Sequence, residues 1–253
     1  MNIIDWIIEL IWYPFRMLYL ITTFWMFYWG SRKEKKWILK NQRYQDNDYN
    51  PFLKRWEYAI GKINGLAFKL GISVEIKGKE NIKKGGQIIV SNHTSYADSI
   101  ALAKLLGTDF PSTAVGKIEL EKTKLKGYIM GLEVFLIDRS NLRQSAASLM
   151  GSGRWAKENN RPVIIFPEGQ RSKSGELLKF NDATFSMAKK LLLPVTPVTI
   201  IGARNAMKKW YLPGTKKITV IVDEPIKSKD IRHKDAILFA KDVKEKIQKN
   251  LIK

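Results

Sequence analysis

The sequence contains no cysteine and only two histidines. Without cysteine the chain can form no disulfide, no thiolate zinc site and no thiol nucleophile. Two histidines and no H-E-x-x-H sequence leave no familiar zinc ligand set, so we expect no bound metal. Acidic residues are also scarce, since 24 Asp and Glu face 44 Lys and Arg for a net charge of +20. This charge favours an anionic partner, which could be a phosphorylated substrate, a lipid surface or a nucleic acid.

The composition is that of a globular protein, with 45% hydrophobic and 27% charged residues in a chain of 253. From residue 72 onward, short β-type runs alternate with helical stretches, as in α/β folds. The predicted strands are Ser73–Lys77, Gln87–Ser91, Thr113–Gly116, Val134–Ile137, Val163–Phe166, Val195–Ile200 and Ile218–Val222. The predicted helices are Asp98–Leu106, Glu119–Ile129, Leu142–Asn159, Asn181–Leu191 and Lys234–Leu251. We therefore expect residues 72–253 to form a mixed β-sheet flanked by helices, and residues 1–71 to form a separate N-terminal region.

The first thirty residues hold four of the eight tryptophans, and a basic cluster follows them. A signal peptide would begin with positive charge and be shorter. A helix over Ile3–Trp29 would be about 40 Å long, which is enough to span a bilayer. On that helix one narrow polar stripe would be formed by Asp5, Glu9, Arg16 and Thr23. The stripe, and aromatic residues along the whole length, favour a helix lying in the headgroup layer, with a single span as the alternative.

A second amphipathic segment covers Pro51–Leu70, where apolar residues follow helical spacing and cations lie largely off that face. Alone it fits an ordinary helix packed on the core. Beside the first helix it favours a membrane-associated helical pair, with Asn41–Asn50 as the link. We expect a monomeric, monotopic protein on the cytoplasmic face of the cell membrane, attracted to anionic lipid. The cations expected to contribute are Arg32, Lys33, Lys35, Lys36, Lys54 and Lys69.

Two motifs follow predicted strands, at the strand ends where ligands bind in α/β sheets. The first is SNHTSYADS, residues 91–99, which places His93 five residues before Asp98. An imidazole accepts a proton near neutral pH, and a carboxylate beside it can orient the ring and stabilise its charged form. His93 and Asp98 are therefore candidates for a general base and its partner. A surface histidine before a helix-start acid would show the same pattern.

The second motif is FPEGQRS, residues 166–172, whose Pro and Gly indicate a tight turn. Gly169 would allow a ligand close to the backbone, and the planar guanidinium of Arg171 suits a phosphate. Glu168 would orient that guanidinium or bind a substrate hydroxyl. A solvated turn is the alternative. Two further cations follow predicted strands and are either ligand-binding or plain surface residues: Lys117 and Arg139.

These segments resemble the glycerolipid acyltransferase family. NHTSYAD, residues 92–98, is similar to the family's N-H-x4-D box, and FPEGQRS to its F-P-E-G-T-R-S box. Residues 131–139 resemble the block that ends F-I-D-R, and residues 193–198 the last, proline-containing block. The blocks occur in the family's order within residues 72–200, and size and spacing fit the 1-acylglycerol-3-phosphate acyltransferases. Gln170 in place of Thr or Ser, and Ala183 in place of a frequent Gly, depart from the pattern and bear on substrate detail.

The resemblance implies transfer of a fatty acyl group to the free hydroxyl of 1-acylglycerol-3-phosphate, giving phosphatidic acid. The donor would be a thioester, either acyl-CoA or acyl-acyl-carrier-protein, and no permanently bound cofactor is implied. His93 would take the hydroxyl proton while Asp98 holds the imidazole. The hydroxyl would attack directly, because the chain has no G-x-S-x-G elbow for an acyl-serine.

The resemblance also implies roles for the remaining polar residues. Arg139 and Arg171 would hold the glycerol phosphate, with Glu168 assisting. Lys117, or backbone N–H groups near Gly169, would stabilise the oxyanion.

Other functions stay open on the sequence alone. A nucleic-acid-binding protein would explain the charge but not the aromatic N-terminal region, and no recognisable reading module is present, so we expect no nucleic-acid partner. A lipase-type hydrolase would need a nucleophile, and Ser91, Ser95 and Ser99 lack the strained-turn context. Transfer to a different lysolipid fits the same motifs.

Overall fold

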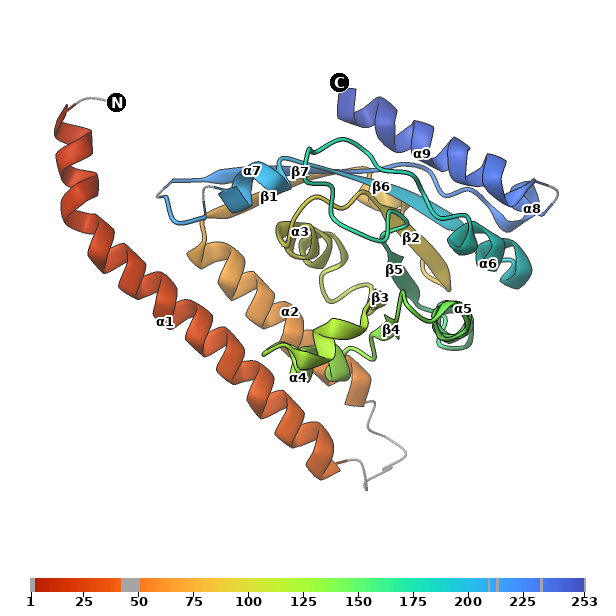
Figure 1. Cartoon of the computed structure of the whole chain (residues 1–253), viewed down its shortest axis with the longest axis horizontal. Coiled ribbons are helices and arrows are strands. Elements are labelled where there is room, and N and C mark those ends of the chain that lie inside the picture. The colour runs from red at the N-terminus through yellow and green to blue at the C-terminus, as the bar shows by residue number, and fades with distance from the viewer. Residues whose placement is uncertain (1–2, 42–50, 209, 213, 233, 253) are drawn as a thin grey trace.

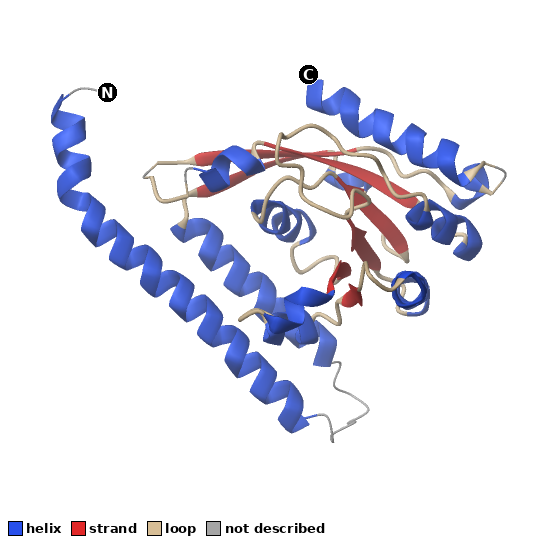
Figure 2. Ribbon diagram, in the orientation of Figure 1, coloured by secondary structure: helices blue, strands red, loops and turns tan. Residues whose placement is uncertain are grey.

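A mixed seven-stranded sheet forms the centre of the protein, as a computed structural model shows for residues 3–41, 51–208, 210–212, 214–232 and 234–252 (Figures 1 and 2). The strand order is β1-β7-β6-β2-β5-β3-β4. All neighbours are parallel except β6 and β7, which are antiparallel. The strands are β1 (Ile72–Lys77), β2 (Gln87–Ser91), β3 (Thr113–Lys117), β4 (Phe135–Ile137), β5 (Pro162–Ile165), β6 (Val195–Ile201) and β7 (Lys216–Val222). The mixed α/β sheet predicted from the sequence is confirmed.

Helices cover both faces of this sheet, so its central strands are buried on both sides. Alternate residues of β2 belong to different hydrophobic clusters: Ile89 lies in one, and Ile88 and Val90 lie in the other. The first cluster includes residues of α2, α3 and α7, and the second includes residues of α5, α6 and α9 (Figure 1). The helices after β1 are α3 (Ala97–Leu106), α4 (Lys126–Gly131), α5 (Leu142–Glu158), α6 (Ala183–Leu191), α7 (Ala203–Lys208), α8 (Ser228–Ile231) and α9 (Ala236–Ile252).

One predicted helix is wrong as a continuous element. The segment Glu119–Ile129 forms a short 3-10 helix, η2 (Ile118–Lys122), and then α4, with a break at Thr123. Thr123 is extended, and its Oγ1 accepts the N–H of Leu125 at 3.2 Å. This bond takes the Leu125 N–H away from the backbone carbonyl that it would bind in a continuous helix. Thr side chains commonly compete with helical hydrogen bonds in this way. The short helices α7, α8 and the 3-10 helix η1 (Lys79–Asn81) were not predicted, because so few residues show no clear period.

The N-terminal region forms two helices, α1 (Ile3–Asn41) and α2 (Pro51–Lys69). α1 is longer than the predicted Ile3–Trp29, and the predicted link lies outside the described residues from residue 42 on. The expected boundary at residue 71 falls between α2 and β1. Within the part of the chain that the structure describes, no helix has both the length and the apolar character that a bilayer crossing requires.

Both N-terminal helices contribute to the main hydrophobic core. Leu20 of α1 and Trp56 of α2 are buried in the same cluster as Val198 and Ile200 of β6. α1 also packs closely on α4, where Ser31 Oγ accepts the N–H of Gly127 at 3.0 Å. A Cβ at Gly127 would lie 1.7 Å from the Ser31 carbonyl oxygen, so only glycine permits this contact. The pair is therefore attached to the sheet body by buried contacts.

The polar stripe predicted on α1 faces the protein wherever the side chains are described. Arg16 donates from Nε to the carbonyl of Tyr211 at 2.7 Å and from Nη2 to that of Leu212 at 2.5 Å. Thr23 is buried. The side chains of Asp5 and Glu9 lie outside the described part. The opposite side of α1 exposes large apolar residues, namely Phe15, Leu18, Ile21, Trp25 and Trp29.

Candidate active site

Four neighbouring parallel strands bring the sequence motifs to one edge of the sheet. β2, β5, β3 and β4 are adjacent and parallel, so their carboxyl ends lie on the same side. His93 follows β2, Glu168 follows β5, Lys117 ends β3 and Arg139 follows β4. The edge thus carries the predicted base and the predicted ligand-binding residues, in the position where α/β sheets bind ligands.

The end of β2 is held by Asn92, a residue to which sequence reasoning assigned no role. Its Nδ2 donates to the carbonyl of Ile200 at 2.9 Å, and its Oδ1 accepts the N–H of Ile200 at 2.8 Å. Asn92 is buried, so this pair of bonds replaces water that the amide would otherwise need. The side chain continues the pairing of β2 with β6 by one step and sets the exit direction of the chain before His93. Its place inside the N-H-x4-D box was the only sequence signal for it.

His93 and Asp98 are in direct contact. His93 Nδ1 lies 2.8 Å from Asp98 Oδ2. Asp98 is fully buried in the first turn of α3, and the same oxygen accepts the N–H groups of Thr94 at 2.6 Å and Ser95 at 2.8 Å. These donors and the helix N-terminus stabilise a negative charge that burial alone would disfavour. The carboxylate is thereby fixed in position.

The imidazole of His93 is oriented from two sides. Its ring stacks on Phe166, with the ring centroids 4.1 Å apart and the planes at 19°. Because a carboxylate is an acceptor, Nδ1 carries a proton toward Asp98 and Nε2 is left as the acceptor. Among the described residues Nε2 has no hydrogen-bond partner, and the side chain is 20% exposed. The arrangement suits removal of a proton from a substrate that approaches from solvent.

Glu168 joins the two motifs through the backbone. Its Oε1 accepts the N–H of His93 at 2.7 Å, and its Oε2 accepts the N–H of Leu178 at 2.9 Å. The N–H of Ser172 donates to the His93 carbonyl at 2.8 Å, which adds a second link. Burial raises the pKa of Glu168, and the hydrogen bonds from His93 and Leu178 oppose that rise. We expected Glu168 to assist the phosphate-binding arginine; its described contacts instead position the loop and the base.

The turn after Glu168 presents Arg171 beside the first motif. Gly169 has a φ of +68°, and a Cβ there would meet nothing within 4 Å, so the backbone conformation rather than space favours glycine. The N–H of Gly169 donates to the Phe166 carbonyl at 3.0 Å, so this expected oxyanion donor is already used in the turn. Arg171 is exposed, with its guanidinium carbon 4.0 Å from the ring centre of Tyr96. The aromatic ring supports the guanidinium by a cation–π contact.

The far side of the loop is held by Arg204, at the start of α7. Its Nη1 donates to the Ser174 carbonyl at 2.7 Å, and its Nη2 donates to the Lys173 carbonyl. Ser172 Oγ accepts the N–H of Gly175 at 3.1 Å within the same loop. Arg204 was not predicted, since nothing in the sequence connects it to residues thirty positions earlier.

Lys117 and Arg139 extend the row of cations along the edge. Both side chains are exposed, and neither has an ion-pair partner among the described residues. The turn that carries Arg139 is ordered by Asp138, whose Oδ1 accepts the Ser140 N–H at 2.9 Å and its hydroxyl at 2.6 Å. An anionic substrate reaching His93 would therefore meet positive charge on the neighbouring strands.

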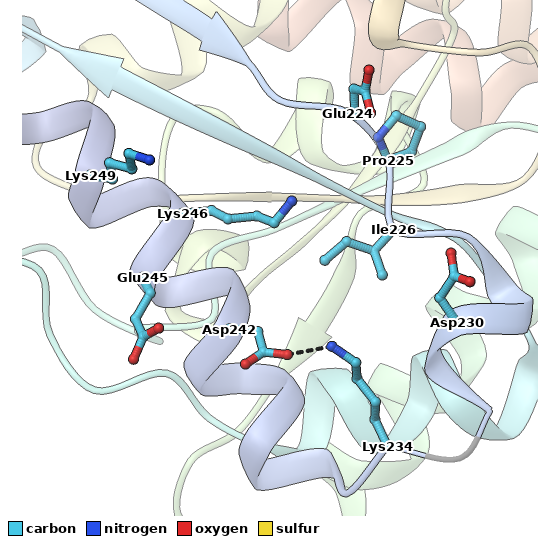
Figure 3. A pocket seen from close by; sticks show the side chains of 9 residues that line it. All are labelled: Glu224, Pro225, Ile226, Asp230, Lys234, Asp242, Glu245, Lys246 and Lys249. Carbon is cyan, nitrogen blue, oxygen red and sulfur yellow. Dashed lines mark hydrogen bonds and ion pairs between the residues drawn. The ribbon is translucent and has the colours of Figure 1, made fainter.

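A cavity of about 510 Å³ between the end of β7 and α9 does not belong to this site (Figure 3). β7 runs antiparallel to β6, so the residues after it lie at the opposite edge of the sheet from His93. The cavity is lined by side chains of both signs, including the ion pair Lys234–Asp242. Over the described ranges, no group of three His, Asp or Glu side chains lies close enough to hold a metal ion.

This chain is similar to known proteins in sequence. Residues 73–201 match the family model described as Acyltransferase. A protein of Mycoplasma pneumoniae named "Probable 1-acyl-sn-glycerol-3-phosphate acyltransferase" is 30% identical over 74% of this chain and 74% of its own length. The Saccharomyces cerevisiae 1-acyl-sn-glycerol-3-phosphate acyltransferase is 28% identical over 77% of this chain and 65% of its own length.

The fold is similar to a solved structure as well. The crystal structure of the 1-acyl-sn-glycerophosphate acyltransferase PlsC from Thermotoga maritima superimposes with a TM-score of 0.71. The superposition covers 96% of this chain and 95% of the Thermotoga maritima chain, and the two sequences are 22% identical. The similarity therefore extends over the N-terminal helices as well as the sheet.

Proposed function

Because this chain belongs to the glycerolipid acyltransferase family and is an acyltransferase, we propose that it acylates the free hydroxyl of 1-acylglycerol-3-phosphate. The product is phosphatidic acid, and the acyl donor is a thioester of coenzyme A or of acyl carrier protein. The observation that carries the proposal is the contact of His93 Nδ1 with the buried Asp98, which leaves Nε2 as a proton acceptor.

The reaction begins when Nε2 of His93 takes the proton of the acceptor hydroxyl. The hydroxyl oxygen attacks the thioester carbonyl, a C–O bond forms, and the negative charge on the carbonyl oxygen rises. When the C–S bond breaks, the leaving thiolate takes the proton from the imidazolium. Asp98 stabilises the imidazolium without itself gaining a proton.

Direct attack by the substrate is supported by the positions of the serine hydroxyl groups near His93, which do not contact its Nε2. Ser91 Oγ is buried and donates to the Asn92 carbonyl at 3.3 Å, while Ser95 Oγ accepts the Ala97 N–H at 3.0 Å. Among the described residues no serine or threonine hydroxyl contacts His93 Nε2. The pairing that activates a serine nucleophile is therefore missing there, and the substrate hydroxyl takes its place.

The phosphate of the acceptor is held by Arg171 and Arg139, which lie at the same edge of the sheet. The contact with Tyr96 restrains Arg171, so its planar guanidinium can bind a phosphate with two N–H groups at little loss of freedom. Lys117 lies between them in strand order and stabilises the oxyanion, since the N–H of Gly169 is already bonded.

Replacing His93 by Ala tests the base. We expect the rate to fall by about 10²–10⁴, the usual contribution of a general base. His233, the second histidine of the sequence, provides the matched control, because His233→Ala changes the same residue type. The assay uses detergent-purified protein, a panel of lysolipid acceptors, and both acyl-CoA and acyl-carrier-protein donors. Normal turnover by folded His93→Ala protein, or a burst of thiol release indicating an acyl-enzyme, would reject the mechanism.

The enzyme is proposed to work as a monotopic, monomeric protein on the cytoplasmic face of the cell membrane. The support is the apolar outer side of α1, where Trp25 is 64% exposed and Phe15 63%. A monomeric soluble protein rarely exposes so continuous an apolar surface, and the lipid acceptor resides in the bilayer. Deleting α1 is a poor test, because Leu20 is part of the buried core.

Point substitutions on α1 are the better test of membrane docking. Trp25→Ser with Phe15→Ser should weaken flotation with vesicles, whereas Ile237→Ser with Leu238→Ser on α9 removes exposed apolar groups elsewhere and should not. A tag at Met1 that is accessible only from outside intact cells would support a single span and reject the monotopic arrangement.

A further inference from the structure

A second cavity, of about 750 Å³, lies between the C-terminal half of α1 and the segment 121–127. We call it the α1–η2 pocket. Its two walls are fastened together: Gly127 donates to Ser31 Oγ at 3.0 Å, and Tyr128 donates from its hydroxyl to the Phe27 carbonyl at 3.0 Å. The pocket is therefore part of the packed structure rather than a gap between mobile elements. None of its lining residues belongs to the catalytic or phosphate-binding set described above.

The charge of the α1–η2 pocket is strongly positive. Five cations line it, Arg32, Lys35 and Lys36 from α1 and Lys124 and Lys126 from the opposite wall, against the single acid Glu121. Residues 32, 35 and 36 have the spacing that places side chains on one side of a helix. No ion pair of these five cations occurs among the described residues. Like charges gathered in a concave surface attract an anion with several acceptor oxygens, such as a phosphodiester.

The pocket also has an aromatic part. Trp25 and Trp29 stack with ring centroids 6.3 Å apart, and they are 64% and 46% exposed. Indole rings partition to the boundary between headgroups and acyl chains of a bilayer. Trp25 is at the same time part of the apolar outer side of α1. The polar and apolar parts of the pocket therefore follow each other in the order found along a phospholipid.

We propose that the α1–η2 pocket binds the phosphate headgroup of an anionic phospholipid of the leaflet, as a site separate from the acceptor site. This inference rests on the proposed docking of α1 in the membrane interface. The cations bind the phosphate, and the indoles lie against the glycerol and the first part of the chains. η2 begins directly after Lys117, so a lipid held by Lys124 and Lys126 also holds the segment that leaves the catalytic edge.

The test compares two lysines of one segment. Lys124 lines the pocket, whereas Lys122, two residues earlier and also exposed, does not. Binding of the full chain is measured by flotation with mixed phosphatidylcholine–phosphatidylglycerol vesicles and with pure phosphatidylcholine vesicles. Lys124→Ala should weaken binding to the mixed vesicles about fivefold, the usual effect of one basic residue at an anionic surface, while Lys122→Ala changes it less than twofold. Equal losses for the two variants would indicate diffuse attraction and overturn the pocket.

Competition identifies the ligand. Short-chain phosphatidylglycerol should release the protein from mixed vesicles, and Lys124→Ala should raise the concentration needed about fivefold; short-chain phosphatidylcholine should not release it. Release by inorganic phosphate at similar concentration would assign the pocket to a free anion, and release by RNA with the same sensitivity to Lys124→Ala would assign it to nucleic acid. Both results overturn the lipid proposal. Turnover of a water-soluble, short-chain acceptor is measured in parallel: its absence in the wild-type protein would reject the proposed function and leave the vesicle result standing.

Discussion

The backbone N–H of His93 donates to Oε1 of Glu168 at 2.7 Å, which connects residues 75 positions apart in the chain. The contact exists because β2 and β5 are adjacent and parallel, so the turns that follow them leave the sheet side by side. The two sequence motifs are therefore one structural unit: the carboxylate of the second positions the backbone that carries the base of the first.

Glu168→Gln should lower both stability and turnover. A glutamine amide has one acceptor oxygen, so one of the two N–H groups, that of His93 or that of Leu178, loses its partner. An unsatisfied buried N–H costs about 1–3 kcal/mol. We expect a decrease in melting temperature of roughly 2–4 °C per kcal/mol for a chain of this size. Glu176→Gln, an exposed acid in the same loop, is the control; if both variants melt like the wild type, the positioning role is wrong.

Arg204→Ala should raise the KM for the lipid acceptor. Its two hydrogen bonds to loop carbonyls hold the segment that follows Arg171, and one such bond contributes about 0.5–1.5 kcal/mol. We expect a rise in acceptor KM of about two- to tenfold with kcat and donor KM nearly unchanged. Arg204→Lys keeps the positive charge and one donor nitrogen and should recover part of the loss, and Arg154→Ala, at an exposed position of α5, should have no effect. A defect in kcat alone would contradict a role through the loop at residues 168–175, here called the phosphate loop, which carries Arg171.

Arg171→Ala and Arg139→Ala test the assignment of the phosphate site. Each should weaken use of lysophosphatidic acid by about 1.5–3 kcal/mol, and mainly through acceptor KM, because a charge-assisted bidentate contact is lost. Arg143→Ala removes an exposed cation in the first turn of α5, four residues after Arg139, and serves as the control. A loss confined to the KM of the thioester donor would reassign the arginines to phosphates of that donor.

The pH dependence of stability should contain a contribution from Glu34 of α1. This side chain is buried with Oε1 unpartnered among the described residues, and burial raises its pKa, opposed by Arg55. A carboxyl whose folded-state pKa is above its usual 4.5 favours the folded state when protonated, so this contribution is lost as pH rises through the raised pKa. Tyr58 and Tyr128 face it and stay neutral, because burial raises their pKa as well.

Glu34→Gln should therefore increase the free energy of unfolding at neutral pH by about 1 kcal/mol and make little difference in acid. Urea unfolding at several pH values measures this. A variant that is less stable than the wild type at neutral pH would show that the charged carboxylate is needed at the junction of α1 and α4. Glu57→Gln on the exposed side of α2 supplies the comparison.

The sequence alone determined the elements whose residues are near one another in the chain. The period of the hydrophobic residues predicted all seven strands to within two residues at each end, because burial on a sheet leaves a local pattern. The two motifs identified His93 and Asp98, since five residues of a turn and a helix start suffice to bring them together. The family resemblance rests on the same short segments.

Only the tertiary structure decided what depends on contacts between distant segments. The role of Glu168 as a backbone acceptor, the pairing of Asn92 with Ile200 and the hold of Arg204 on the phosphate loop depend on which strands are neighbours. The direction of the polar stripe of α1 required the position of residues 211 and 212, and the α1–η2 pocket required α1 to lie against the segment after β3. Local periodicity shows that a side chain is to be buried or exposed. Its partner follows only from strand order and packing, which are set by the sum of many weak long-range contacts.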